Sequence, residues 1–290
     1  MNNSFWEKPD LLVLSGSNLY GYATPESDED KLGFVVPPLE LMVGLGGFEQ
    51  KLSSKEEMEA GDDYKIYGIR KFFHNLLRND TQSMEILFAP QSHIKACTDI
   101  GAEVINNRHL FISKAMYKRF AGYAYSEFRK VRGVAIVPKK QTTDEKSLID
   151  QVRNTFRPDK KSMGQILEML YANKPKEEVS IFRKLGKQRK ESIEKYGYST
   201  KNAAHCIRLL FEGIELLKTG ELTFPRPDDE LVLLKAIRSG EKTIEEVTVK
   251  FEELEIKLKE AADVSTLQNK PNNKEAEKLL VRLISKHVSL

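Results

Sequence analysis

Short hydrophobic runs in the N-terminal third of the chain predict β-strands, because each run ends at turn-forming residues. Three strands are expected from these runs: Leu11–Leu14, Asp28–Val36 and Tyr64–Ile69. The first ends at the turn Ser15-Gly16-Ser17, and the second is stopped by Pro37-Pro38. Short helices are predicted at residues 18–23, 71–78 and 84–88. The glycine-rich and then charged stretch 44–61 is expected to hold strand remnants and loop.

Beyond about residue 100, apolar residues recur at the three- and four-residue spacing that is typical of helices. Helices are predicted at residues 109–131, 181–195 and 203–218, and another is marked by Ile244, Val247, Phe251, Leu254 and Leu258. Gly220 is the expected C-cap of the helix at 203–218, and Pro225 follows shortly beyond it. Residues 138–161 are polar and charged, which predicts a loop.

The composition is that of a globular protein, with 290 residues of which 40% are hydrophobic and 31% charged. This length allows one large domain or two smaller ones. The net charge of +3 is too small to indicate nucleic acid by itself, and Cys97 and Cys206 lack the spacing of a zinc site or a disulfide framework. No segment approaches the roughly 18 apolar residues that span a bilayer, and the polar start is unlike a signal peptide. We therefore expect a cytoplasmic protein with no membrane partner.

Asp28 and Asp30 are two residues apart in the second predicted strand, so both project to one side while Glu29 points away. Two neighbouring carboxylates repel unless a cation lies between them, and Mg²⁺ commonly shares such oxygen ligands with substrate phosphates. Upstream, Gly16 lets the backbone approach a ligand closely and Ser17 supplies a hydroxyl. We therefore expect a phosphate and metal site. The alternative is a pair of surface acids in a turn after an ordinary glycine bend.

A third carboxylate is expected if the site displaces a group at phosphorus, because such reactions benefit from activation of the attacking oxygen. Asp63, at the start of the third predicted strand, is the candidate. Asp62 is its rival, because a slip of one residue reverses the face of a strand. The alternative for Asp63 is a solvent-facing acid before a strand.

A polar stripe follows one face of the helix predicted at 203–218 and its N-terminal extension. At about 100° per residue, four polar residues fall together: Lys201, His205, Arg208 and Glu212. The opposite side is apolar and consists of Ile207, Leu210, Phe211, Ile214 and Leu217. Lys, His and Arg on one face suit phosphate oxygens. The alternative is a solvated face on which Glu212 pairs with Arg208, with His205 half-buried and structural. The remaining histidines lack ligand spacing and are interpreted as structural or surface residues: His74, His93, His109 and His287.

The segment GSNLYGYATPESDEDKLGFVVPP resembles the signature of polymerase-β-superfamily nucleotidyltransferases. It is most similar to the RNA-repair-associated branch called RlaP or YcgL, which reads roughly GSxAYGxATPxSDxDxRGV. Three later segments resemble that branch in the same order: DYKIYGIRKFFHNLLRNDTQSMEILFAP, GYSTKNAAHCIRLLFEGIELLKTGEL and STLQNKPNNKEAEKLLVRL. The resemblance covers nearly the whole chain. It departs from the branch at Asn18-Leu19, Lys31-Leu32, Ser199 and Asn202, where other residues are common.

The resemblance implies an α/β (α+β) fold. We expect a nucleotidyltransferase domain with a mixed sheet at residues 1–95, followed by a mainly α-helical domain at 96–290 that closes the nucleotide cleft. By resemblance, Gly16 and Ser17 hold the triphosphate, and Asp28, Asp30 and Asp63 are the catalytic, metal-binding acids. Lys201, His205 and Arg208 are the implied nucleotide-binding residues of the helix. Two Mg²⁺ ions are expected, with Mn²⁺ as an alternative.

The predicted reaction moves a nucleoside monophosphate from a nucleoside triphosphate to an acceptor hydroxyl. A nucleic-acid end, RNA or DNA, is the expected acceptor, and the basic run from Arg183 to Lys190 would help to bind it. That run could equally be a solvated face. A small-molecule or protein hydroxyl is the alternative acceptor, and a non-catalytic nucleotide-binding module is the alternative from another functional class.

Overall fold

The computed structural model describes residues 4–24, 27–59, 61–131, 134–138, 151, 155, 176–180 and 186–288. Most of the loop predicted at 138–161 lies outside the described residues, as does the start of the helix predicted at 181–195. The described end of that helix is α10, Lys187–Tyr196.

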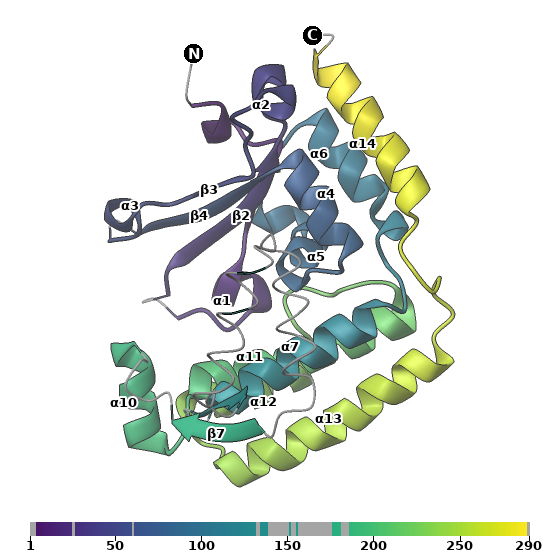
Figure 1. Cartoon of the computed structure of the whole chain (residues 1–290). Coiled ribbons are helices and arrows are strands. Elements are labelled where there is room, and N and C mark those ends of the chain that lie inside the picture. The colour runs from purple at the N-terminus through teal and green to yellow at the C-terminus, as the bar shows by residue number, and fades with distance from the viewer. Residues whose placement is uncertain are drawn as a thin grey trace.

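A mixed five-stranded sheet forms the N-terminal part of the fold, in the order β3-β4-β2-β1-β5 (Figure 1). The strands are β1 Leu11–Leu14, β2 Glu29–Val35, β3 Gln50–Leu52, β4 Asp62–Gly68 and β5 Ile94–Cys97. Strand β2 pairs antiparallel with β1 and parallel with β4, while β3 and β5 form the two edges. The three predicted strands are therefore confirmed as the inner strands. Edge strand β3 lies in the stretch 44–61, where strand remnants were predicted without bounds, and edge strand β5 was missed. Both strands are short and partly exposed, which leaves no continuous apolar run.

Helices α4, α5 and α6 pack against one face of this sheet (Figure 1). Their bounds are α4 Ile69–Leu77, α5 Thr81–Phe88 and α6 Asp99–Asn106. Phe72 of α4 is fully buried and stacks on Phe34 of β2 with ring centroids 4.7 Å apart. Asp80 caps α5 by accepting from Ser83 N, so the turn between α4 and α5 is fixed as well. Shorter helical segments complete this part: η1 Phe5–Glu7, α1 Gly16–Tyr20, α2 Leu39–Val43, α3 Lys55–Glu59 and η2 Gln91–His93.

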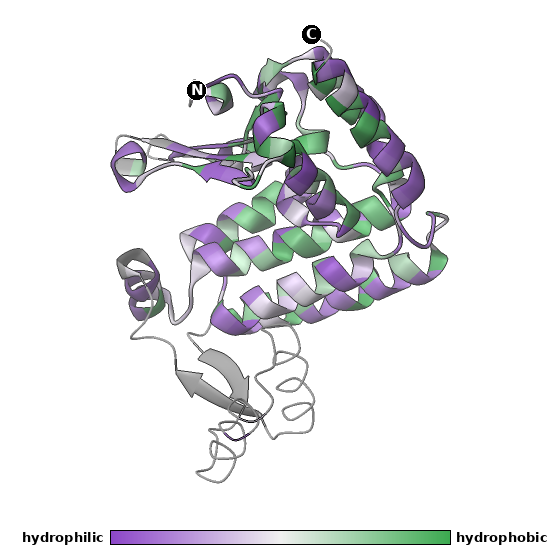
Figure 2. Cartoon of the chain, turned by 45° about the horizontal axis from the view of Figure 1, so that its top comes forward, coloured by the Kyte–Doolittle hydropathy of each residue, from purple (hydrophilic) through white to green (hydrophobic). Residues whose placement is uncertain are grey.

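Helices dominate the rest of the described chain, and α11 lies at their centre. The elements are η3 Arg108–Leu110, α7 Met116–Val131, α11 Thr200–Thr219, α12 Asp228–Ser239, α13 Ile244–Val264 and α14 Asn273–Val288, with a β6–β7 pair at Val134–Pro138 and Lys176–Ser180. Helix α11 packs on α7, α12 and α13 and buries residues along its whole length. In Figure 2, α10 is largely hydrophilic, whereas α7 and α11 carry hydrophobic stretches. The mixed sheet followed by helices confirms the predicted α+β fold class.

Several predicted helices begin at other residues than those observed, and two of these differences have a clear cause. The helix predicted at 109–131 is interrupted, because the Gln268 side chain donates to the carbonyls of Leu110 and Ile112, and Lys114 N donates to Gln268 O at 2.8 Å. These bonds replace helical ones, so α7 starts only at Met116. The helix predicted at 18–23 is α1, Gly16–Tyr20, and Gly21 ends it with a φ of 89°.

The C-terminal helix α14 returns to the N-terminal part and packs on α4. Asn272 N donates to Leu110 O at 2.8 Å, and Arg282 pairs with Glu103 of α6. One continuous cluster of buried hydrophobic residues runs from Leu11 in the sheet to Leu283 in α14. Across the described ranges, no helix is long and apolar enough to cross a bilayer.

Candidate active site

A cleft of about 770 Å³ lies between the acid-bearing end of the sheet and helices α10, α11 and α12. Every candidate site residue chosen from the sequence lines it: Gly16, Ser17, Asp28, Asp30, Asp63, Lys201, His205 and Arg208. These residues come from α1, β2, β4 and α11 and the segment before β2. The structure therefore brings together positions that are separated by almost 200 residues in the sequence.

Gly16 lies directly against the carboxylate of Asp30. A Cβ added to Gly16 would lie 2.0 Å from Asp30 Oδ2, and the φ of Gly16 is +62°. Ser15 N donates to Asp30 O at 2.8 Å, which ties the bend after β1 to β2. The turn reaches the acid only because no side chain stands between them.

The parallel register of β2 and β4 brings Asp63 beside Asp30. Burial raises the pKa of Asp30, and the negative charges of Asp63 and Asp28 raise it further, while Lys201 opposes them. Ser53 Oγ donates to Asp63 Oδ1 at 2.8 Å and so orients that side chain. Three acids therefore act on one another at the wall of the cleft.

The same register distinguishes Asp63 from its rival. Asp62 pairs with Glu29, the exposed residue between Asp28 and Asp30, whereas Asp63 pairs with Asp30. Since alternate residues of a strand face opposite sides, the register favours Asp63 as the third acid.

The acids suit a divalent cation that takes some of its ligands from a substrate. Among the residues that the structure describes, no three His, Cys, Asp or Glu side chains are grouped closely enough to hold a metal ion by themselves. Burial first, and then the negative charges of Asp63 and Asp28, nevertheless raise the pKa of Asp30, so a cation beside these acids would stabilise its ionised form. Mg²⁺ is commonly held by one or two carboxylates together with substrate phosphates. The chemistry of the acids therefore fits Mg²⁺ in a ternary complex with a nucleotide.

Lys201 and His205 line the opposite wall from one face of α11. Lys201 is exposed, and its positive charge lowers the pKa of Asp30. His205 is half-buried, and its ring meets the ring of Tyr123 edge-on at 5.4 Å. Burial first, and then the charges of Arg208, Lys130 and Lys201, lower the pKa of His205 to about 3. The imidazole is therefore neutral at physiological pH.

Arg208 also reaches the cleft, but its terminal nitrogens are engaged inside the protein. Nη1 donates to Glu85 Oε1 at 2.8 Å and to Glu212, and Nη2 lies 2.9 Å from His205 Nδ1. The alternative interpretation of this stripe is confirmed in part. Arg208 pairs with Glu212, but these two residues do not lie on a solvated face, because their side chains are 1% and 0% exposed. Glu85, on α5, was not identified from the sequence, since nothing in its neighbourhood indicates a distant arginine.

Other cleft residues were also missed. Arg238, at the end of α12, holds its guanidinium 5.3 Å from the centre of the Tyr22 ring, and both residues line the cleft. Thr24 N donates to Ser27 Oγ at 2.8 Å in the turn that leads to the acids. That turn belongs to the segment that carries the family resemblance, which was the available signal for it. Arg189 is the described member of the predicted basic run that lines the cleft.

The two departures on α11 form a buried network beside the cleft. Ser199 Oγ donates to Asn202 Oδ1 at 3.0 Å, and Asn202 Nδ2 donates to Glu127 Oε2 at 2.9 Å. All three residues are buried. Asn202 and Ser199 therefore join α11 to α7. Both hydrogen bonds use Asn202, one of the positions at which this chain departs from the residues common in the branch.

Comparison with known proteins confirms the resemblance. The model of the RNA repair pathway DNA polymerase beta family, RlaP, matches residues 11–282. An uncharacterized 38.9 kDa protein from the nrdC-mobD intergenic region of Enterobacteria phage T4 is 24% identical over 282 residues, covering 80% of this chain and 83% of its own length. No solved structure matches the chain. Because the family match spans nearly the whole sequence, the chain belongs to the RlaP family of polymerase-β-like proteins.

Proposed function

We propose that this protein transfers a nucleoside monophosphate from a nucleoside triphosphate to an acceptor hydroxyl, and that the acceptor is the end of an RNA strand. Membership of a polymerase-β family suggests nucleotidyl transfer. The observation that carries the proposal is the contact of Gly16 with Asp30, at a cleft that Lys201 lines from the other side.

Asp28, Asp30 and Asp63 are the residues that would hold divalent cations in this cleft. When bound, Mg²⁺ would neutralise the negative charge that develops on the phosphates during transfer. Because the acids form no complete three-ligand group, the cation would bind tightly only when phosphate oxygens complete its coordination. Metal and nucleotide should therefore bind cooperatively.

The triphosphate would lie between the two walls of the cleft. Gly16 allows the backbone to approach it closely, and Ser17 offers a hydroxyl from α1. Lys201 supplies positive charge from α11. Binding at both walls would orient the α-phosphate toward the acceptor, and positioning of this kind accounts for much of the catalysis of phosphoryl transfer.

Asp63 would act as the general base that activates the acceptor hydroxyl. Its Oδ1 accepts from Ser53, so the carboxylate is held in one orientation and Oδ2 is the oxygen to take a proton from the attacking hydroxyl. Arg189 lines the same cleft, and its guanidinium suits the phosphates of a nucleic-acid acceptor.

The test is incubation of the protein with Mg²⁺, labelled nucleoside triphosphates and a panel of RNA and DNA ends. We expect label on an RNA end, and its loss in an Asp28→Ala, Asp30→Ala double variant. Glu29→Ala is the matched control, since Glu29 lies between these acids but is not among the residues that line the cleft, and this variant should retain transfer. Label incorporation that persists in the double variant would falsify the assigned acids.

The same experiment separates the acceptors. A nucleic-acid acceptor should bind more weakly as salt rises, because its phosphates release counterions on binding. Transfer to a small molecule or to a protein hydroxyl would leave the RNA and DNA ends unlabelled. Tight binding of a non-hydrolysable nucleotide without any transfer would identify a non-catalytic module instead.

A further inference from the structure

Arg208 lies beneath the cleft and joins three elements of the fold. Its Nη1 donates to Glu85 of α5 and to Glu212 of α11, and its guanidinium lies 3.5 Å from the centre of the Tyr20 ring of α1. The Tyr20 hydroxyl donates to the second oxygen of Glu85 at 2.7 Å. The side chains of Arg208, Glu85 and Glu212 are at most 2% exposed. A guanidinium paired with two carboxylates and stacked on a ring is held in one orientation.

This orientation fixes the proton on the His205 ring. Arg208 Nη2 lies 2.9 Å from His205 Nδ1, and a guanidinium carries donors but no acceptor. His205 Nδ1 must therefore accept, and in a neutral imidazole the ring proton then sits on Nε2. Protonation of Nδ1 would break this hydrogen bond and bring two cations into contact.

The other groups around the ring leave this state undisturbed. Lys201, from α11, and Lys130, from α7, add positive charge that opposes a second ring proton. Glu127 of α7, which lines the same cleft, accepts from Lys130 and from Asn202 through its two oxygens. This carboxylate is therefore already engaged by other donors.

We propose that Arg208 is a positioning residue that holds His205 as the neutral, Nε2-protonated tautomer, so that His205 donates an N–H from α11 to a phosphate oxygen of the bound nucleotide. His205 lines the cleft, and among the described residues no hydrogen-bond partner of its Nε2 is present. Lys201, one helical turn earlier, lines the same wall. The nucleotide would thus meet a cation and a neutral donor side by side. That the acceptor of this hydrogen bond is a phosphate oxygen of a nucleotide rests on the proposed function.

A histidine-detected proton–nitrogen correlation spectrum of the full-length protein reads the tautomer directly. We expect His205 to show a protonated Nε2 and an unchanged pattern between about pH 5 and pH 8, a range in which an ordinary histidine titrates. A protonated Nδ1, or titration within this range, would overturn the proposal. The signal is assigned by its loss in His205→Gln. This measurement needs no nucleotide transfer. The tautomer assignment can therefore fail while the proposed function stands, and the proposed function can fail while the tautomer assignment stands.

Removal of Arg208 alone would leave two buried carboxylates without their cation, and that variant can fail to fold. The double variant Arg208→Gln, Glu212→Gln removes one charge of each sign, so the net charge of the buried cluster is unchanged. We expect His205 in this variant to populate both tautomers and to titrate closer to its ordinary pKa. A His205 spectrum identical to that of the unmodified protein would show that Arg208 does not set the tautomer.

The donor role is tested by binding of a non-hydrolysable nucleoside triphosphate. His205→Gln keeps an N–H donor near the position of Nε2, whereas His205→Ala removes it. We expect roughly tenfold to hundredfold weaker binding for His205→Ala, the range for a lost hydrogen bond to a charged group, and at most a few-fold change for His205→Gln. Unchanged binding in His205→Ala would refute the donor role. So would binding by His205→Gln that is as weak as binding by His205→Ala.

Discussion

Gly16 meets two constraints at a single residue. Its φ is +62°, in the region that favours glycine, and an added Cβ would lie 2.0 Å from Asp30 Oδ2. Gly47 has a similar φ of +67°, but nothing lies within 4 Å of an added Cβ. Both glycines therefore need a left-handed backbone, but only Gly16 of this pair also lies against Asp30.

This pair gives a prediction that separates strain from displacement. Gly16→Ala and Gly47→Ala should each lower the free energy of unfolding by about 1 kcal/mol, the cost of a left-handed alanine. Gly16→Ala should also displace Asp30 and reduce transfer by roughly a hundredfold, as misplacement of a reacting group does. Thermal unfolding and label transfer measure the two effects. Equal activity of the two variants would contradict the role given to Gly16.

Asp30 carries a second prediction at this scale. Since its pKa is raised in the folded protein by burial and by Asp63 and Asp28, ionised Asp30 destabilises the fold. Its contribution to stability is present below the unfolded pKa of about 4 and is lost as pH rises through the folded value. Asp30→Asn should therefore raise Tm at neutral pH, with a gain that shrinks toward acid pH, while it abolishes transfer. A lower Tm at neutral pH would show that Asp30 is well compensated in the free protein.

Single residues differ in how far the sequence predicts them. The spacing of Asp28 and Asp30 predicted that both project to one side, and both line the cleft, although Asp28 lies just before β2. The partners of Arg208 were not predictable in the same way. Glu85 lies 123 residues away, and the ion cluster depends on side chains of α5 and α1, Glu85 and Tyr20, that reach Arg208.

Helix α11 serves two purposes along its length. Its first turns carry Lys201 and His205 to the cleft, and its middle buries Arg208 and Glu212. Two carboxylates, Glu85 and Glu212, share the guanidinium of Arg208 out of contact with water. Burial as the largest cause, and the charge of Glu85, raise the pKa of Glu212 from 4.5 to about 7 against the opposing effect of Arg208.

The helix should therefore respond to pH through Glu212. Because the folded pKa is raised, the protonated side chain contributes stability below about pH 4.5, and this contribution is lost as pH rises to about 7. The loss is on the order of 3 kcal/mol. Glu212→Gln cannot titrate, so its free energy of unfolding relative to the unmodified protein should rise across this window and then stay level. Denaturant unfolding at several pH values measures it, and parallel curves for the two proteins would contradict the assignment.

Whole elements were predicted where a signal is continuous along the chain. The inner strands carry apolar or alternating residues, α11 carries apolar residues at helical spacing, and the predicted C-cap Gly220 ends α11 with a φ of 73°. The break before α7 was not predictable, because it is made by Gln268, a residue more than 150 positions away. Edge strands and short helices showed only weak hydrophobic patterns in the sequence, because their exposed positions tolerate polar residues.

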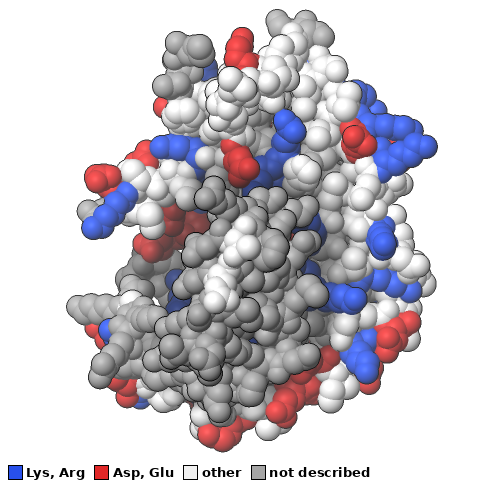
Figure 3. Space-filling view, viewed as in Figure 1, with Lys and Arg blue, Asp and Glu red and all other residues white. Residues whose placement is uncertain are grey.

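The two halves of the molecule share one hydrophobic core. Helix α14, the last element of the chain, packs on α4 beside the sheet, and Leu283 is fully buried there. On the face in Figure 3, acidic and basic side chains are interspersed, with basic ones gathered over α14. The net charge of +3 is the small difference between many basic and many acidic side chains, and their distribution marks no single partner surface in this view.

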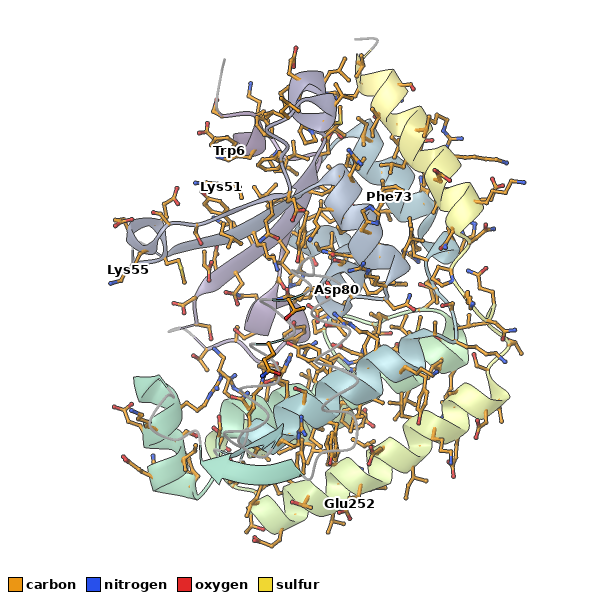
Figure 4. The ribbon with its side chains drawn as sticks, in the orientation of Figure 1. Trp6, Lys51, Lys55, Phe73, Asp80 and Glu252 are labelled. Carbon is orange, nitrogen blue, oxygen red and sulfur yellow. The ribbon has the colours of Figure 1, made fainter. Side chains whose placement is uncertain are left out.

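A shared core predicts cooperative unfolding. Trp6 is the single tryptophan and lies at the N-terminal part, 5.6 Å from Lys51 Nζ and on the sheet side of the molecule in Figure 4. Its fluorescence reports that part, while helical circular dichroism reports mainly the rest. Leu283→Ala should lower stability by about 2–5 kcal/mol and shift both transitions together. Val281→Ala, 58% exposed on the same helix, is the control and should change little. Separate transitions would mean that the two halves unfold independently.

We propose that the acids beside Gly16 catalyse transfer of a nucleoside monophosphate. The sharpest test compares nucleoside triphosphates labelled on the α-phosphate with those labelled on the γ-phosphate, using the unmodified protein and the Asp28→Ala, Asp30→Ala variant. We expect the acceptor to gain the α-label but not the γ-label, and the variant to transfer neither. Transfer of the γ-label, or of the α-label by the variant, would contradict the proposed reaction.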